Sequence, residues 1–408
     1  MTFAPPPPLP RQSSNRDLEA PTPLLGPFGI YIHIPFCRHI CPYCDFNTYS
    51  GLENLAPEYV DALCREIDCW APEFIGREAV SVFIGGGTPS LLAPKLIERL
   101  IDATRSAFSL AADAEITVET NPNDLDEAYC KALFTAGINR LSVGGQTFNH
   151  RGLRVLGRKH SEHQVHQALV AARAAGFSSI NVDLIYGWPG QSLDMWRDDL
   201  EKITAPGNGG LVPDHLSLYS LIIEPGTPMA DAVARGILTP ASDDESADFF
   251  EEAITFLRER GWRHYEIANW AGPTGTPSRH NAVYWRNGDY AGIGAGAHGH
   301  VQGRRTMNHP APRRYIELVS EGHSPVSNVE RIDPATSMGE TMMLGLRLLD
   351  KGVSPEAFAK RHGVSLQARF GETIERLSDL GLLIAHDDRV VLTDRGALLA
   401  NSVCAEFL

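Results

Sequence analysis

Six short apolar segments alternate with amphipathic segments between residues 30 and 221, and this alternation limits the possible folds more than any other feature of the sequence. Because parallel strands need crossover helices, strand–helix units in series predict a parallel sheet. Nearly continuous apolar strands fit a sheet covered on both faces or a barrel. The expected strands are 30–34, 80–84, 115–119, 140–144, 180–184 and 215–221, and the expected helices are 57–70, 92–108, 125–136, 162–176 and 192–203. The sequence therefore predicts an α/β fold, a partial (β/α)6 barrel of the TIM type that is open on one side.

The segments on either side of this alternation predict two further parts. Residues 1–28 are rich in proline, which removes backbone donors, so we expect a disordered tail. After about residue 225 the alternation breaks down: a helix ending at Gly261 is expected, followed by a Gly-rich and aromatic region from Trp262 to about Asn308. This region is expected to add an accessory β region to the barrel, giving a domain over residues 29–320. Helical patterns followed by a hairpin pattern then predict a small, mainly helical, winged-helix-like domain over residues 325–408.

Charge and cysteine content exclude several functional classes. The formal net charge is −14, and since a phosphate backbone favours clustered Lys and Arg, we expect no nucleic-acid partner. Seven cysteines without a secretory signal pattern indicate a reducing cytoplasm with free or metal-bound thiols. The longest apolar runs are too short to span a bilayer, so any membrane contact would be peripheral.

Polar or small residues follow the predicted strands where each strand ends. The loops at the carboxyl ends of parallel barrel strands share one face, and active sites lie there. We therefore expect these residues to meet at one end of the barrel. In chain order they are Cys37, Cys41 and Cys44, then "GGGTPS" (85–90), Glu119, Gln146 and Asp183.

The three cysteines have the spacing C-x3-C-x2-C, from Cys37 through Cys41 to Cys44. Thiolates are soft ligands that suit zinc, copper(I) or iron–sulfur clusters. Three thiolates can hold three irons of an iron–sulfur cube and leave the fourth iron open for another ligand. The spacing also allows a structural zinc site completed by His33 or His39, or simply free cysteines.

Three other motifs allow both a functional and a structural interpretation. The glycines of "GGGTPS" let a backbone approach a ligand, but a tight turn between strand and helix would also use them. Arg158 in "GRKH" could hold a carboxylate, or could be an exposed arginine at a helix end. His280 in "HNAVYW" could line an apolar cofactor, or could be a satisfied histidine in a Gly-rich region.

Taken together, these motifs resemble the radical S-adenosylmethionine (SAM) enzymes. The resemblance rests on "YIHIPFCRHICPYCDF", "FIGGGTPS", "EITVETNP", "LGRKH", "NVDLIYGWPGQ" and "HNAVYW". Within that superfamily the chain looks like the branch that contains oxygen-independent coproporphyrinogen III oxidase and the heme chaperones called HemW. The match extends from about Gly29 to the C-terminus, and taken jointly its motifs are highly specific.

The resemblance implies a role for each matching residue. Cys37, Cys41 and Cys44 would ligate a 4Fe–4S cluster, whose open iron would be chelated by SAM. Arg158 would pair with the SAM carboxylate, and the acidic residues with its amine or ribose. In such enzymes the reduced cluster splits SAM into methionine and a deoxyadenosyl radical. The positions that match the SAM-contacting residues of the family are Tyr31, Tyr43, Gly86, Gly87, Thr88, Glu119, Gln146, Arg158 and Asp183.

Two sequence details favour the chaperone group over the oxidase. The oxidase typically has a fourth cysteine two residues after the third, where this chain has Phe46, and "HNAVYW" is also typical of the chaperones. The resemblance then implies a protein that binds heme, with His280 as an iron ligand or as a pocket residue, and that delivers heme to respiratory membrane hemoproteins. Coproporphyrinogen dehydrogenase is the alternative. Whether SAM is consumed stays open, so enzymatic activity is left undecided, and cluster binding could drive formation of a homodimer.

Overall fold

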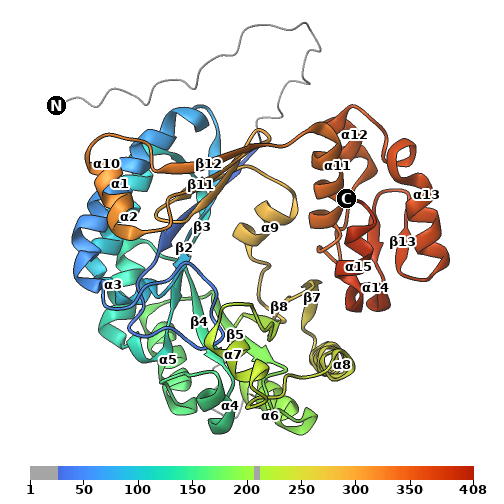
Figure 1. The fold of residues 1–408 in the computed structure, drawn as a ribbon, viewed down its shortest axis with the longest axis horizontal. Coiled ribbons are helices and arrows are strands. Elements are labelled where there is room, and N and C mark those ends of the chain that lie inside the picture. Colours follow the sequence, from blue (N-terminus) through green and yellow to red (C-terminus); the bar gives the residue numbers. More distant parts are fainter. Residues whose placement is uncertain (1–25, 206–211) are drawn as a thin grey trace, which may run out of the picture.

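The computed structural model describes residues 26–205 and 212–408. These residues form one curved twelve-stranded sheet with helices on its outer side, and a smaller helical domain beside it (Figure 1). The two edge strands of the sheet are not hydrogen-bonded to each other, so the barrel is open, as the sequence predicts.

All six predicted strands are present, and each pairs in parallel with the next. Most of their residues are buried on both faces, as expected for a parallel sheet covered by helices. The carboxyl ends of these strands therefore meet at one end of the barrel. The strands are β1 (Phe28–Ile34), β2 (Glu78–Gly86), β3 (Ser109–Thr120), β4 (Arg140–Gln146), β5 (Ile180–Tyr186) and β6 (His215–Ser220).

The accessory region extends the sheet on both sides of these six strands. The added strand next to β1 is also parallel to it, so the parallel part has a seventh strand that the alternation does not predict. The other added strands are antiparallel. The sheet order is β12-β11-β10-β9-β1-β2-β3-β4-β5-β6-β8-β7. The added strands are β7 (Arg263–Glu266), β8 (Asn269–Ala271), β9 (Tyr290–Ile293), β10 (His298–Val301), β11 (Arg304–Asn308) and β12 (Val326–Arg331).

The five predicted helices of the barrel cover the outside of the sheet (Figure 1). Local sequence signals fix several of their ends: Ser161 and Gln164 form a capping box, and Gly176 ends the same helix in the left-handed conformation. A short helix, α4, follows β4 and is not predicted by periodicity. The helices up to the accessory region are α1 (Ala56–Trp70), α2 (Pro94–Ala107), α3 (Glu127–Ala136), α4 (His150–Val155), α5 (Glu162–Ala175), α6 (Leu193–Thr204), α7 (Pro228–Ala234) and α8 (Asp243–Glu259).

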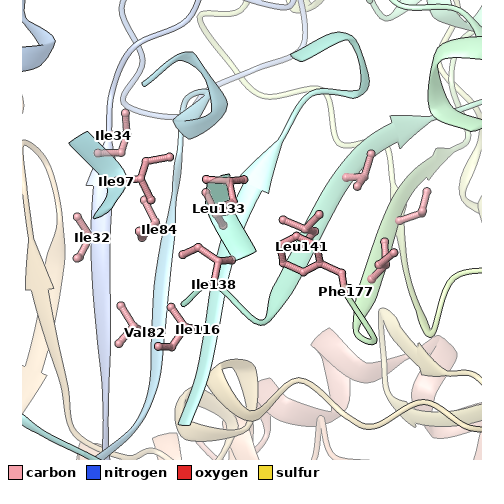
Figure 2. Packing of buried hydrophobic residues seen from close by; sticks show 14 of the residues in the cluster. Ile32, Ile34, Val82, Ile84, Ile97, Ile116, Leu133, Ile138, Leu141 and Phe177 are labelled. Carbon is pink, nitrogen blue, oxygen red and sulfur yellow. The ribbon is translucent and has the colours of Figure 1, made fainter. Parts of the chain in front are cut away.

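The main hydrophobic core lies between the strands and these helices. Figure 2 shows Ile84 of β2 beside Ile97 of α2, and Ile138 beside Leu133 of α3. Each of these side chains is almost completely buried. Burial of a branched aliphatic side chain stabilises the fold by about 1.5–3 kcal/mol, so this layer fixes the position of the strand ends.

The C-terminal domain is mainly helical and contains the predicted hairpin. It begins after Arg331, because β12 still pairs with β11 in the large sheet, which is later than the boundary at residue 325 that the sequence suggests. Its residues 347–349 pair with the edge strand β7 and so attach it to the barrel. Its elements are α11 (Pro334–Gly345), α12 (Pro355–His362), α13 (Leu366–Asp379), β13 (Leu383–Ala385), β14 (Val390–Leu392), α14 (Asp394–Leu398) and α15 (Ala400–Ala405).

Two helices of the accessory region and the N-terminal segment complete the fold. Helix α9 (Arg279–Trp285) lies on the inner side of the curved sheet, toward the C-terminal domain, and α10 (Pro312–Ser320) packs beside α1 (Figure 1). Of the predicted tail, residues 1–25 lie outside the described residues, and Phe28 belongs to β1 and is fully buried. Among the helices in the described parts of the chain, none is both long and apolar enough to cross a membrane.

Candidate cofactor-binding site

The cysteine motif forms a loop directly after β1, at the carboxyl end of the barrel strands. Backbone hydrogen bonds fix this loop: the amide of Cys37 donates to the carbonyl of Tyr49 at 2.9 Å, and the amide of Cys44 donates to the carbonyl of Cys41 at 3.1 Å. Cys37 is buried, and the thiols of Cys41 and Cys44 lie in partly exposed residues. The fold therefore holds the backbone of the loop firmly and leaves its three thiols free of disulfides.

The glycine motif at the end of β2 packs directly against this loop. The amide of Gly87 donates to the carbonyl of Ile34 at 2.8 Å, and the amide of Thr88 donates to that of Phe36 at 2.8 Å. Gly86 has φ +114° and lies against the ring of His33, so a side chain at this position would be strained and would clash. The glycines thus bring the second strand close enough to support the cysteine loop.

A ring of polar side chains surrounds the cysteines. The Thr88 hydroxyl lies 3.4 Å from the Cys37 sulfur, and the Asn121 side-chain amide donates to that hydroxyl at 3.4 Å. The Arg158 guanidinium donates to Asn121 Oδ1 at 2.6 Å and to the Cys41 sulfur at 3.7 Å. Asn121 follows Glu119 in the motif "TNP", and sequence reasoning did not single it out. The ring provides both a cation and neutral donors beside the thiols.

Burial shifts the protonation of the most enclosed thiol. The pKa of Cys37 is raised, chiefly because burial disfavours the thiolate, while the hydrogen bond from Thr88 opposes that shift. The thiolate form of a cysteine at this position therefore benefits from a positively charged partner. A metal centre bound to the loop would supply one, since a coordinating thiol is deprotonated outright.

A cavity of about 210 Å³ lies inside the barrel, and its lining comes from β1 to β6 and from the region of α9. Two partly buried carboxyl groups, Glu119 and Asp183, line it, and the backbone amide of Gly86 donates to Glu119 at 2.8 Å. Asn181 and Ser142 donate to Asp183 at 2.8 and 3.0 Å. The residues that line the cavity are Tyr31, Phe83, Glu119, Arg140, Ser142, Asn181, Asp183, His215, Ser217, Tyr219, Ser278, His280, Asn281 and Tyr284.

The two carboxyl groups are not fully stabilised by the protein. Burial raises the pKa of Glu119 to about 8, the Gly86 amide opposes this shift, and the charge of Asp183 adds to it. Burial also raises the pKa of Asp183, although its hydrogen bonds oppose the shift. A ligand amine or hydroxyl would add a further hydrogen-bond donor to each of these groups.

The remaining predicted SAM-contacting residues lie around the same end of the barrel. Gln146 ends β4 with φ 62°, a left-handed conformation that is uncommon for a side-chain-bearing residue and often marks a functional position. Tyr31 of β1 lines the cavity, and its hydroxyl lies 2.9 Å from His33 Nδ1. Tyr43 packs with Leu156 and Trp188 next to the cysteine loop. Of the nine predicted positions, three line the cavity, and Gly87, Thr88, Tyr43 and Arg158 lie at the cysteine loop.

His280 lies on α9 and also lines the cavity, but its ring nitrogens are already occupied. Nδ1 lies 2.9 Å from the Ser81 hydroxyl and Nε2 lies 2.8 Å from the Tyr284 hydroxyl. The side chain is almost completely buried, and burial lowers its pKa to about 3, so the ring is neutral at physiological pH. Coordination of an iron by either nitrogen would require one of these hydrogen bonds to break.

Glu115, which sequence reasoning missed, holds α9 in this position. Its carboxylate accepts hydrogen bonds from the backbone amides of Arg279 and His280, each at 3.0 Å. Arg140 adds a cation 3.9 Å away. Because Glu115 is more than 160 residues before these partners, no local pattern in the sequence indicates the contact.

The zinc alternative requires a histidine to join the three cysteines. His33 Nε2 lies 2.9 Å from the carbonyl of Asn47, and His39 Nε2 lies 3.2 Å from that of Gly157. Across residues 26–205 and 212–408, no group of three or more His, Cys, Asp or Glu side chains is arranged to hold a single metal ion. In this structure both histidines are engaged with backbone carbonyls.

Comparisons with known proteins match both parts of the fold. A family model described as the radical SAM superfamily matches residues 31–203, and one described as the HemN C-terminal domain matches residues 332–399. The heme chaperone HemW of Bacillus subtilis is 37% identical over 379 residues, which cover 93% of this chain and 98% of that protein. HemW of Escherichia coli is 37% identical over 396 residues, which cover 94% and 99%.

A solved structure of a different named activity is also similar. The coproporphyrinogen III oxidase HemN from Escherichia coli, described as a radical SAM enzyme, is 26% identical and has a TM-score of 0.79. The similarity covers 96% of this chain and 92% of that chain. It therefore includes the barrel, the accessory strands and the C-terminal domain.

Proposed function

Because the chain belongs to the radical SAM superfamily, in the branch of the HemW heme chaperones and HemN, we propose that it is a cytoplasmic heme chaperone. In this proposal it binds a 4Fe–4S cluster, SAM and heme, and it delivers heme to respiratory membrane hemoproteins. The observation that carries the proposal is the 37% identity to chaperones of this name over more than nine tenths of the chain.

The residues on the cysteine loop fit the cluster, and those beside it fit SAM. Cys37, Cys41 and Cys44 are three thiols on one rigid loop, which suits a cluster that keeps one iron for another ligand. When bound, the cluster and SAM together supply one-electron chemistry at the sulfonium. Arg158 would orient the SAM carboxylate, since its guanidinium already lies at the loop. The carboxyl groups of Glu119 and Asp183 would accept hydrogen bonds from the amine or ribose.

The size of the barrel cavity favours the chaperone over the oxidase. A volume of about 210 Å³ is below the ~300–1,000 Å³ of pockets that enclose a whole drug-sized ligand, so the cavity can hold only part of SAM, and α9 forms one of its walls. A whole tetrapyrrole is larger than such ligands, so we expect heme to bind outside this cavity. The oxidase would instead have to enclose its porphyrinogen near SAM. Phe46, in place of the fourth cysteine of the oxidase, supports the same choice.

The similarity to HemN keeps coproporphyrinogen dehydrogenase as the second candidate. One experiment separates the two: the reconstituted protein is given coproporphyrinogen III and SAM under anaerobic reducing conditions, and a parallel sample is titrated with heme. We expect a saturable heme absorbance band and no conversion of the porphyrinogen. Robust turnover would reject the chaperone proposal in favour of the oxidase.

Iron analysis of the same preparation tests the cofactor part of the proposal. Anaerobic reconstitution with iron and sulfide should give close to four irons and four sulfides per chain, with the broad visible absorbance of an iron–sulfur cluster. A preparation that takes up zinc and no iron would support the structural zinc alternative instead.

A further inference from the structure

His298 of β10 is an exposed histidine whose ring has no polar partner. Most histidines in the described residues use a ring nitrogen within the protein, as His300 does, with Nδ1 3.1 Å from the carbonyl of Gly288. Within residues 26–205 and 212–408, only the side chains of His163, His298 and His386 make neither a hydrogen bond nor an ion pair. Both ring nitrogens of His298 are therefore available to a ligand.

The side chain of His298 points to the open side of the barrel and not to the covering helices. The next residue, Gly299, faces helix α1, because an added side-chain carbon there would lie 3.4 Å from the ring of Trp70. Successive residues of a strand point to opposite faces, so His298 points away from α1. No residue of β10 or β11 lines the cavity, and the histidine therefore lies outside it.

A methionine and an aromatic ring share this face with His298. Met307 of β11 is directly opposite His298 in the antiparallel register, and side chains of such a pair lie on the same face. Tyr290 of β9 is opposite His300 in the same way, two residues along from His298. The ring of Tyr290 contacts Tyr284 of α9 edge-on, with 4.6 Å between the centroids. We call His298, Met307 and Tyr290 the His298 face.

The glycines before His298 fix its position. A side chain at Gly292 would overlap the carbonyl oxygen of His298, so only glycine lets β10 pass so close to β9. Gly294 and Gly296, in the turn between these strands, have φ 106° and 73°, which also favour glycine. The run "GIGAGAHG" thus holds the histidine in one place, although its ring is exposed.

The His298 face lies beside the cysteine loop. The Asn47 side-chain amide, three residues after Cys44, donates to the carbonyl of Ala295 in the turn before His298 at 3.0 Å. Burial lowers the pKa of His33, at the end of β1, and the charge of His298 adds to this shift, which requires the two rings to be near each other.

We propose that heme binds on the His298 face, outside the cavity, with His298 as the iron ligand. This inference rests on the proposed function. Histidine is a common ligand of heme iron, and a macrocycle held over the imidazole would contact the apolar groups of Met307 and Tyr290. The lone pair of the neutral ring forms the iron–nitrogen bond, the water ligand of free heme leaves, and no electron is transferred.

The arrangement supplies one protein ligand and suits release of the heme. Met307 lies on the same face as His298, so it cannot reach the opposite side of the macrocycle. The sixth position of the iron would stay open to a ligand from a recipient. Burial and the charge of Arg305 lower the pKa of His298, so its ring is neutral at neutral pH, as coordination requires.

The test is a heme titration of the reconstituted full chain, followed by difference spectra, with ferric heme and with ferrous heme before and after carbon monoxide. The test variants are His298→Ala and the larger His298→Gln. The matched controls are His163→Ala and His386→Ala, which remove the two other exposed histidines without a polar partner. Met307→Leu tests whether the sulfur ligates the iron, since leucine keeps most of the apolar contact.

We expect one saturable heme per chain, with a five-coordinate ferrous spectrum that carbon monoxide converts to a six-coordinate one. Both His298 variants should bind heme at least about tenfold more weakly and shift the absorbance band, because the iron loses its protein ligand. The two control variants and Met307→Leu should keep the band position and stay within about twofold of the unaltered affinity, since surface substitutions have small effects. The iron content of the cluster should be the same in all variants.

An unchanged band and affinity in both His298 variants would overturn the proposal, as would a band that shifts in Met307→Leu or in a control variant instead. These results would leave the proposed function standing, because the unaltered protein would still bind heme. An unaltered protein that binds no heme saturably would overturn both the proposed function and this inference. Conversion of coproporphyrinogen is measured separately and bears on the proposed function alone.

Discussion

The cysteine loop and helix α9 are the two regions that the sequence motifs single out, and the fold treats their polar atoms in opposite ways. In the loop, backbone groups are paired while the three thiols form no disulfide, and their printed side-chain contacts, from Thr88 to Cys37 and from Arg158 to Cys41, are long. In α9, the side chain of His280 uses both ring nitrogens within the protein, and Glu115 satisfies the backbone amides at the start of the helix. The difference indicates that the loop is built to bind and the helix is built to hold the shape of the barrel interior.

The strongest test of this comparison removes the thiols. We expect Cys37→Ser, Cys41→Ser and Cys44→Ser together to abolish iron binding completely, because no other thiol in the described residues lies at the loop. The unfolding free energy of the metal-free protein should change by less than about 1 kcal/mol, since serine is close to cysteine in size and two of the three residues are only partly buried. Iron analysis and urea unfolding measure the two effects. The control is Cys69→Ser, at an exposed cysteine of α1, and this variant should keep its iron. Retention of iron by the triple variant would show that the loop is not the cluster-binding site.

The converse test weakens the support of α9. Glu115→Ala should lower the unfolding free energy by about 3 kcal/mol, because it leaves the amides of Arg279 and His280 and the cation of Arg140 without their buried acceptor. Its iron content should be unchanged. Glu330→Ala removes an exposed partner of Arg305 and should cost less than about 1 kcal/mol.

Equal stability of the Glu115 and Glu330 variants would show that α9 does not depend on the buried carboxylate. Loss of iron in the Glu115 variant would show that the helix and the loop are not independent, and the comparison would then fail. Both results come from the same urea titrations and iron assays as the cysteine variants.

The sequence predicts the features of the two regions that rest on local contacts, and it does not predict those that rest on distant contacts. The cysteine spacing and the glycine motif are short-range patterns, and the structure places them side by side as the strand order requires. The strands are long enough and apolar enough to be recognised from composition. Glu115 and Asn121 were not recognised, because their partners come from distant parts of the chain.

The polar cavity has a signal in the sequence, a polar residue at every second position of three strands. Arg140 and Ser142 in β4, and Asn181 and Asp183 in β5, are spaced by two residues, as are His215, Ser217 and Tyr219 in β6. Successive strand residues point to opposite faces, so polar residues at every second position mark one polar face. That period would have predicted a polar interior on these three strands, although not its size.

Two groups that line the cavity, Glu119 of β3 and His280 of α9, should respond to pH in opposite directions. The pKa of Glu119 is raised by burial to about 8 from an ordinary value near 4.5, so the folded protein holds a proton that the unfolded chain releases. Stability of the ligand-free protein should therefore fall, by up to ~1.4 kcal/mol per pH unit, as pH rises from about 4.5 to about 8. Burial lowers the pKa of His280 to about 3, so its contribution is full above about pH 6.5 and is lost as pH falls toward 3.

Replacement of each group separates these contributions. Urea unfolding between about pH 5 and about pH 9 should show a flatter decline on the alkaline side for Glu119→Gln than for the unaltered protein. His280→Gln should reduce the loss of stability on the acid side and leave the alkaline side unchanged. If Glu119→Gln kept the full alkaline slope, its carboxyl group would not be the protonated one in the cavity.

The smallest expected effect decides what the HNAVYW motif does for heme. If His280 ligates the iron, His280→Ala should shift the position of the heme absorbance band, whereas Tyr284→Phe, which only frees Nε2, should not weaken binding. If α9 instead supports, from the barrel interior, the outer surface at which heme binds, both variants remove one end of the same 2.8 Å hydrogen bond and should weaken heme binding by similar factors, about five- to tenfold. The band position and the iron content should then stay unchanged.

Because both ring nitrogens of His280 are occupied and the side chain is buried, we expect the second result. Spectrophotometric heme titrations of the two variants measure the heme affinity and the band position. A shifted band in His280→Ala alone would place the histidine on the iron, and α9 would then bind a ligand as the loop does.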